Sequence, residues 1–167
     1  MTAGTVDTSV VVVGAGPAGT AAATRLARSG FAVTVVDKAR FPRDKCCGDG
    51  LTTGALRLLE ELGLDPAAVP SWQRVDDVVV RSPSGREVTF PMPRGAGTYA
   101  AVSRRIDLDA ALVDVARSAG AKVLDGHACT GVTEHADRVE VEVADFGTLT
   151  AGWVVAADGM WSPVRKH

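Results

Sequence analysis

Residues 9–19 read SVVVVGAGPAG, and this stretch decides the fold. Its β-branched run, Val10–Val13, is typical of a strand that is buried on both faces, as strands of parallel sheets usually are. After the glycine turn, Ala18, Ala22 and Leu26 recur at the spacing of one helix face. The sequence therefore predicts a strand, a tight turn and a helix in direct succession.

A second strand, predicted over Phe31–Val36, completes a βαβ unit, whose strands are parallel. A helix over residues 51–62 and a hairpin of residues 77–81 and 86–90 follow. Then come a helix with an apolar face over residues 108–116 and Gly120 at its end, and a strand over residues 122–124. The first of these helices presents an apolar face of Ala55, Leu58, Leu59 and Leu62. The alternating pattern of residues 129–155 predicts a three-stranded antiparallel meander.

The glycines of the first turn form the pattern G-x-G-x-x-G between a predicted strand and a predicted helix. Gly14 makes the turn, Gly16 lets the backbone approach a pyrophosphate, and Gly19 lets helix and strand pack closely. Pro17 is tolerated in the first helical turn, whose N–H groups and positive dipole face the phosphates. This context predicts a dinucleotide site.

Asp37 ends the second strand roughly 20 residues further on, where a carboxylate accepts hydrogen bonds from an adenosine ribose. Its charge would repel a 2′-phosphate, so NADP is not expected as the tightly bound nucleotide. The alternative is a glycine-rich turn beside an exposed acid. We predict an α/β fold: a Rossmann-like FAD/NAD(P)-binding parallel sheet, the antiparallel meander, and the start of a substrate-side β region.

The composition argues against a nucleic-acid-binding, exported or metal-binding protein. The 167 residues are 46% hydrophobic, and the net charge is −2. The chain has no block of basic residues, so nucleic acid is not expected as a partner. The first eight residues have neither a basic region nor a long apolar stretch, so no export is expected. Three cysteines, Cys46, Cys47 and Cys129, form no CxxC pair, which predicts no metal site and favours a reducing cytoplasm.

Three further segments carry a resemblance to known flavoproteins. Residues 41–51, FPRDKCCGDGL, resemble the P-x-x-K-x-C-G-D-G segment of the geranylgeranyl reductase family. Residues 105–112, RIDLDAAL, resemble the R-x-x-x-D-x-x-L helix start that this family shares with flavin aromatic hydroxylases. Residues 158–165, DGMWSPVR, resemble their second FAD signature, D-G-x-x-S-x-x-R. The resemblance implies FAD as cofactor and a fold like that of para-hydroxybenzoate hydroxylase.

The resemblance also implies roles for individual residues. Arg105 would lie near the FAD phosphates and ribityl chain, and Asp158 would bind the ribityl hydroxyls or oppose the phosphates through Gly159. Ser162 and Arg165 would hold that loop. The segment of Lys45, Cys47, Gly48 and Asp49 would lie beside the flavin ring.

Other interpretations of these residues stay open. Arg105 can be a solvated arginine at a helix start, Asp158 can belong to a simple Asp-Gly turn, and Cys47 can be a packing thiol. No residue is assigned to catalysis. The complete predicted cofactor site is Gly14, Gly16, Pro17, Ala18, Gly19, Asp37, Lys38, Lys45, Cys47, Gly48, Asp49, Arg105, Asp158, Gly159, Ser162 and Arg165.

Three functions follow as hypotheses. The first is a flavin-dependent reductase that saturates isoprenoid double bonds on a lipid or quinone, with NADPH, NADH or ferredoxin as the electron donor. The second is an aromatic hydroxylase or halogenase that uses oxygen, and the third is flavin binding without turnover. We expect residues 1–167 to be an incomplete FAD-binding domain, with residues 75–103 entering the substrate-side sheet and a C-terminal remainder absent. The expected location is cytoplasmic, with membrane-peripheral attachment of the full-length protein left open.

Overall fold

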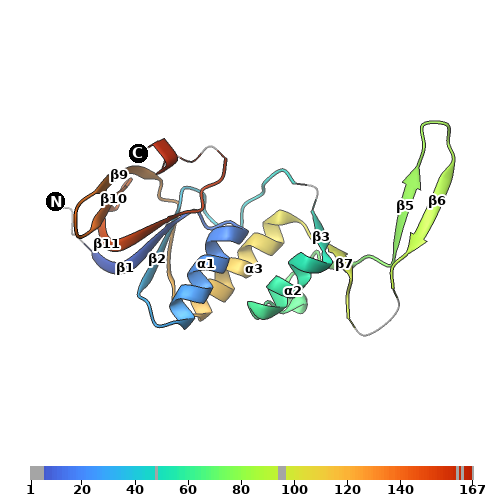
Figure 1. The fold of residues 1–167 in the computed structure, drawn as a ribbon, viewed down its shortest axis with the longest axis horizontal. Coiled ribbons are helices and arrows are strands. Elements are labelled where there is room, and N and C mark those ends of the chain that lie inside the picture. The colour runs from blue at the N-terminus through green and yellow to red at the C-terminus, as the bar shows by residue number, and fades with distance from the viewer. Residues whose placement is uncertain (1–5, 48, 94–96, 161, 163, 167) are drawn as a thin grey trace. The chain divides into compact units, whose positions relative to one another are not determined.

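The computed structural model describes residues 6–47, 49–93, 97–160, 162 and 164–166. It divides into two compact units, one of residues 1–43 with 109–167 and one of residues 44–108. Figure 1 shows the course of the chain through both.

The first unit is built on a six-stranded sheet with the order β8-β2-β1-β11-β10-β9. Its strands are β1 (Val6–Val13), β2 (Val33–Asp37), β8 (Lys122–Asp125), β9 (Cys129–Glu134), β10 (Val139–Val143) and β11 (Gly147–Ala156). The pairs β8-β2, β2-β1 and β1-β11 are parallel, whereas β11-β10 and β10-β9 are antiparallel. The predicted parallel sheet and three-stranded meander are thus confirmed.

Strand β1 is buried on both faces, as its continuous valine run predicts. Val10 and Val12 pack with Ala23 of α1 (Pro17–Arg28) and Val113 of α3 (Arg105–Ser118). On the opposite face, Val11 and Val13 pack with Val141 and Leu149 of the meander. The two helices therefore cover one side of the parallel strands, and the meander residues complete the core of the other side (Figure 1).

Leu149 is fully buried in this second core, with 0% of its surface exposed. Replacing it by alanine removes buried methyl groups and leaves a cavity, so we expect a loss of about 2–5 kcal/mol in the free energy of unfolding. Leu58→Ala is the matched control because Leu58 is 60% exposed, and a change within about 0.5 kcal/mol is expected there. Urea denaturation measures both, and equal losses would contradict the assigned core.

The second unit carries short strands around one helix. Strands β3 (Gly50–Thr52), β7 (Ala100–Val102) and β4 (Gln73–Arg74) form a three-stranded antiparallel sheet, and α2 (Thr53–Glu61) follows β3 directly. A 3-10 turn covers Pro66–Ala68. The helix predicted over residues 51–62 is therefore wrong at its start, because Leu51 and Thr52 pair with β7 as a strand.

The apolar face of α2 also differs from the prediction. Leu56 and Leu62 are buried, whereas Leu58 is 60% exposed. The predicted hairpin is present as β5 (Asp77–Arg81) and β6 (Glu87–Pro91), and every residue of both strands is exposed.

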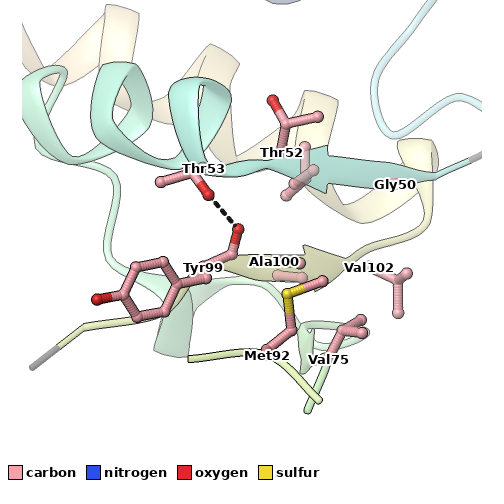
Figure 2. Close-up of a pocket in the computed structure, with 10 residues that line it drawn as sticks. Gly50, Thr52, Thr53, Val75, Met92, Tyr99, Ala100 and Val102 are labelled. Carbon is pink, nitrogen blue, oxygen red and sulfur yellow. Dashed lines mark hydrogen bonds between the residues drawn. The ribbon is translucent and has the colours of Figure 1, made fainter. Parts of the chain in front are cut away.

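A pocket of about 430 Å³ lies on the second unit (Figure 2). Its lining is largely apolar and includes Leu51, Val75, Met92, Tyr99, Ala101 and Val102. The Thr53 hydroxyl donates a hydrogen bond of 2.6 Å to the Tyr99 carbonyl at its edge. Tyr99 supplies the one titratable side chain among these lining residues, so the pocket offers little acid-base chemistry of its own.

Candidate functional site

The candidate site of the first unit lies where three strands end. The Gly14 N–H donates to the Val36 carbonyl at 2.7 Å, and the Ala157 N–H donates to the Val13 carbonyl at 2.8 Å. These bonds join the ends of β1, β2 and β11 around the loop that leads into α1. Ligands of open α/β sheets bind at the carboxyl ends of the strands, which is where this loop lies.

Close contacts explain why the loop needs glycine at positions 14 and 19. Gly14 has φ +101°, and a Cβ there would lie 2.4 Å from the Ala157 carbonyl oxygen. A Cβ on Gly19 would lie 1.8 Å from the Gly14 carbonyl oxygen. Any side chain at either position would force the loop apart from α1 and β11.

Gly16 differs from these two glycines because its surroundings are open. Apart from its chain neighbours, the one described atom that a Cβ at Gly16 would meet within 4 Å is Nη2 of Arg43, at 3.7 Å. Gly16 is also the N-cap of α1, without a side-chain hydrogen bond, and Pro17 follows as the first helical residue. The start of α1 therefore presents backbone N–H groups and the positive end of the helix dipole to an open space.

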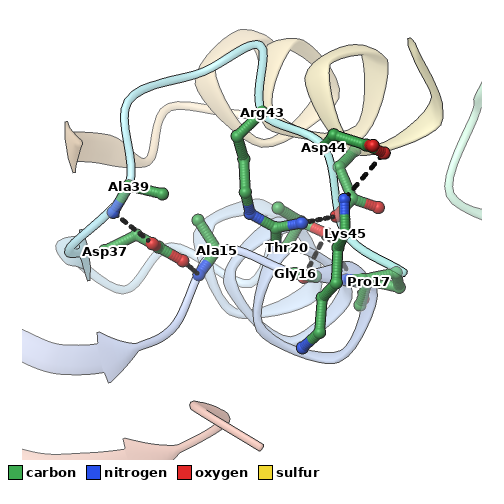
Figure 3. Close-up of polar contacts among 10 residues, drawn as sticks. Ala15, Gly16, Pro17, Thr20, Asp37, Ala39, Arg43, Asp44 and Lys45 are labelled. Atoms are coloured by element: carbon green, nitrogen blue, oxygen red, sulfur yellow. Dashed lines mark hydrogen bonds and ion pairs between the residues drawn. The ribbon is translucent and has the colours of Figure 1, made fainter. Parts of the chain in front are cut away.

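Asp37 supports the same loop from the end of β2 (Figure 3). Its Oδ2 accepts a 2.7 Å hydrogen bond from the Ala15 N–H, and its Oδ1 accepts one of 2.8 Å from the Ala39 N–H. An ionised carboxylate has about four acceptor positions, so room remains for a ribose hydroxyl. Lys38, which follows Asp37, is exposed.

Asp37→Asn is expected to weaken FAD binding about 10-fold, because asparagine offers one oxygen for two backbone N–H donors. A fluorescence titration with FAD measures the effect. Asp114→Asn serves as the control, since Asp114 is exposed on α3 and pairs with Arg117. Affinity within twofold of the wild type for Asp37→Asn would show that these two bonds do not organise the site.

Asp158 is the strongest sign that a ligand belongs here. Both of its carboxylate oxygens are buried, and neither has a hydrogen-bond partner among the residues that the structure describes. Its Cα would lie 2.8 Å from a Cβ on Gly14, so it borders the glycine loop. Burying a charged group without a partner is costly, which indicates that a polar ligand completes this site.

The turn after Asp158 is fixed by short-range hydrogen bonds. Gly159 has φ +90°, and its carbonyl accepts from the Ser162 N–H at 3.2 Å. The Ser162 hydroxyl, in turn, accepts from the Arg165 N–H at 3.0 Å.

Cys129 is partly buried, and burial is the main cause that raises the pKa of its thiol. The negative charges of Asp158 and Glu142 raise this pKa to a lesser extent.

The remaining predicted site residues belong mostly to the second unit. Lys45 and Cys47 are exposed, and Gly48 lies outside the described residues. Asp49 adopts the left-handed conformation with φ 55°, and its carbonyl accepts from the Ser103 N–H at 3.0 Å. Arg105 is half-buried at the start of α3, while its exposed neighbour Arg104 forms an ion pair with the half-buried Asp107.

One pair of residues at the loop was not assigned a role by the sequence. Arg43 Nη1 lies 2.8 Å from Oδ2 of Asp109, as an ion pair that falls short of an aligned hydrogen bond. Asp109 stands in the R-x-x-x-D pattern and Arg43 in the P-R-D-K segment, so both were visible in motifs. Their contact depends on tertiary packing, which the motifs do not encode.

The geometry fits a dinucleotide: a helix start without a side-chain cap, an open Gly16, and a buried carboxylate that has no hydrogen-bond partner among the described residues. The model of the FAD binding domain family matches residues 7–167. The chain belongs to this family. FAD is its cofactor, and the family comprises FAD-dependent oxidoreductases and monooxygenases.

Relatives within the FAD binding domain family differ in their named activities. The chain is 42% identical to menaquinone reductase of Mycolicibacterium smegmatis, over 94% of this chain and 39% of the relative. It is 31% identical to 3-amino-4-hydroxybenzoate 2-monooxygenase PtmB3 of Streptomyces platensis, over 95% of this chain and 41% of the relative. It is also 31% identical to digeranylgeranylglycerophospholipid reductase 1 of Methanothermobacter thermautotrophicus, over 96% of this chain and 41% of the relative.

A solved structure shows the same fold. The p-nitrophenol 4-monooxygenase PnpA of Pseudomonas putida DLL-E4 superposes with a TM-score of 0.82 at 22% identity, over 96% of this chain and 43% of the other. The chain spans about two fifths of the length of the three curated relatives described above. The geranylgeranyl reductase family is thus one among several groups of relatives that share this FAD-binding domain.

None of the helices in the described part of the chain has the length and apolar character that a bilayer crossing requires.

Proposed function

We propose that this FAD-binding chain belongs to a reductase that saturates isoprenoid double bonds on a lipid or quinone. The observation that carries the proposal is the segment PRDKCCGDG at residues 42–50, which resembles the geranylgeranyl reductase family. The similarity to proteins named menaquinone reductase and digeranylgeranylglycerophospholipid reductase supports it.

We assign the ADP half of FAD to the glycine loop and to the end of β2. The residues are Gly14, Gly16, Pro17, Ala18, Gly19, Asp37 and Lys38. The loop N–H groups bind phosphate oxygens, and Asp37 accepts a hydrogen bond from the ribose. The tight packing of Gly14 and Gly19 keeps these donors in place before the cofactor arrives.

The second group of residues acts on the flavin half. Asp158 accepts hydrogen bonds from the ribityl hydroxyls, and Arg105 pairs with phosphate oxygens. The turn of Gly159, Ser162 and Arg165 holds Asp158 in position. We assign the segment of Lys45, Cys47, Gly48 and Asp49 to the ring of the flavin. When bound, FAD supplies hydride transfer between a reduced donor and the alkene, and the protein orients both.

A second candidate is an oxygen-using hydroxylase or halogenase. It is favoured by the similarity to the Streptomyces platensis monooxygenase, and by 34% identity over 72% of this chain to a tryptophan 2-halogenase of Chondromyces crocatus, of which 23% is covered. Residue chemistry within the described part of the chain does not separate it from the reductase, because both use the same FAD-binding domain.

The test is a product assay with the purified full-length protein. It is incubated without oxygen with a polyprenyl quinone or a geranylgeranyl lipid, and with NADPH, NADH or reduced ferredoxin in turn. We expect products that gain the mass of two hydrogens for each saturated bond, as read by mass spectrometry. A parallel incubation under labelled O₂ with an aromatic substrate and the same electron donors tests the second candidate, and labelled oxygen in that product would instead establish the hydroxylase. Flavin binding without any product would overturn both enzymatic proposals.

A further inference from the structure

Asp109 is a fully buried charged residue that forms an ion pair with Arg43. Its side chain on α3 has 0% exposure, and the Arg43 guanidinium beside it is 17% exposed. Aspartate and arginine are rarely buried to this degree unless they are paired. A buried ion pair is nonetheless weak evidence of stabilisation, since desolvation offsets much of the attraction between the charges. Stabilisation of the fold alone therefore does not explain why this ion pair is buried.

The pair holds the guanidinium in a defined place. Nη1 of Arg43 lies 2.8 Å from Oδ2 of Asp109, and the Cζ atom lies 5.1 Å from the centre of the Phe41 ring. A carboxylate on one side and an aromatic ring nearby restrict the rotamers of a side chain that is otherwise flexible.

The Arg43 guanidinium is held at the start of α1. A Cβ built on Gly16 would lie 3.7 Å from Nη2 of Arg43, and Figure 3 shows the guanidinium over the loop beside Gly16. The positive end of the helix dipole and the N–H groups of the first turn face the same space. Two positive features thus converge on it, with no acidic residue in the first turn of α1.

We propose that Asp109 is a positioning residue for the cofactor: it holds Arg43 over the glycine loop, so that the Nη2 edge binds a pyrophosphate oxygen of FAD. Asp109 takes the Nη1 edge, which leaves the other edge of the planar fork for the phosphate. Because the guanidinium is positioned before FAD binds, little side-chain entropy is lost on binding. The proposal rests on FAD as the cofactor and is independent of the substrate.

A thermodynamic cycle on the purified full-length apoprotein tests this. The dissociation constants of FAD and ADP are measured for Arg43→Gln, Asp109→Asn and the double variant, with circular dichroism as the check on folding. Arg43→Gln should weaken both ligands about 10- to 100-fold, since a charge-assisted hydrogen bond is lost. Asp109→Asn should weaken them by a smaller factor, and should add nothing further in the Arg43→Gln background because it acts through Arg43.

Two further measurements distinguish positioning from general support of the fold. Arg43→Gln should flatten the dependence of FAD affinity on salt concentration, whereas Arg43→Lys should retain that dependence and recover part of the affinity. Arg117→Gln, which removes an exposed arginine from the same helix as Asp109, should leave FAD affinity unchanged.

The proposal is overturned if Asp109→Asn weakens FAD equally with and without Arg43, or if Arg43→Gln binds FAD within twofold of the wild type. If Arg43→Gln does not fold, the affinities of Arg43→Lys and Asp109→Asn for FAD and ADP are compared with those of the wild type instead. Affinities of both variants equal to the wild type would then reject the phosphate contact, and weakened FAD and ADP binding in both would support it.

Discussion

Gly19→Ala is expected to abolish FAD binding and to destabilise the first unit. The added Cβ would lie 1.8 Å from the Gly14 carbonyl oxygen and 3.3 Å from the Ala157 Cβ. The obstacle is backbone rather than a flexible side chain, so the loop must move away from the helix start. We expect a loss of several kcal/mol in unfolding free energy, about 2–4 by the scale of overpacked sites. Thermal unfolding and FAD titration measure the two effects.

Gly54→Ala is the matched control for this substitution. Gly54 also lies in the first turn of a helix, α2, but apart from its chain neighbours and the backbone of that helix, no described atom lies within 4 Å of a Cβ built there. Alanine should therefore be neutral or stabilise by up to about 1 kcal/mol through its higher helix propensity. If Gly19→Ala bound FAD as tightly as Gly54→Ala, the close packing of the loop would not matter for the site.

Asp158→Asn is expected to change stability and affinity in opposite directions. Both carboxylate oxygens are buried without a partner among the described residues, which destabilises the apoprotein. Removing the charge should stabilise the apoprotein by about 1–2 kcal/mol. The same change should weaken FAD binding about 10- to 100-fold, because a charged acceptor of ligand hydroxyls is lost.

The two effects are measured by urea denaturation without FAD and by FAD titration. Asp137→Asn is the control, because Asp137 is exposed between β9 and β10 and pairs with Arg138. If Asp158→Asn destabilised the apoprotein and left FAD affinity unchanged, Asp158 would contribute to the fold alone, as part of a simple Asp-Gly turn.

Local sequence patterns predicted the first unit well. The valine run predicted that β1 is buried on both faces, and the glycines followed by apolar residues at helical spacing predicted α1. Both patterns could be recognised because they depend only on residues that are close in the sequence. The parallel strand over residues 122–124 was also predicted, and it extends by one residue to Asp125. The second strand begins at Val33 rather than Phe31, since Phe31 is exposed before the sheet starts.

The second unit was predicted less well because its strands are short. Strands of two or three residues, such as β3, β4 and β7, are too short for an alternating pattern, and their pairing joins segments far apart in the chain. The apolar face of α2 was misassigned at Leu58, because Leu56 completes the buried stripe. Within the site, the contact of Arg43 with Asp109 was missed for a related reason, since burial of a charged residue is set by packing.

The most direct test of the central claim, that the glycine loop binds FAD, is an absorbance titration of the purified protein with FAD beside its Gly16→Val variant. We expect saturable binding with a perturbed flavin spectrum, lost in the variant because a side chain at Gly16 would fill the open space at the start of α1. Equal FAD affinity of the two proteins would contradict it, as would a full-length protein that does not bind FAD.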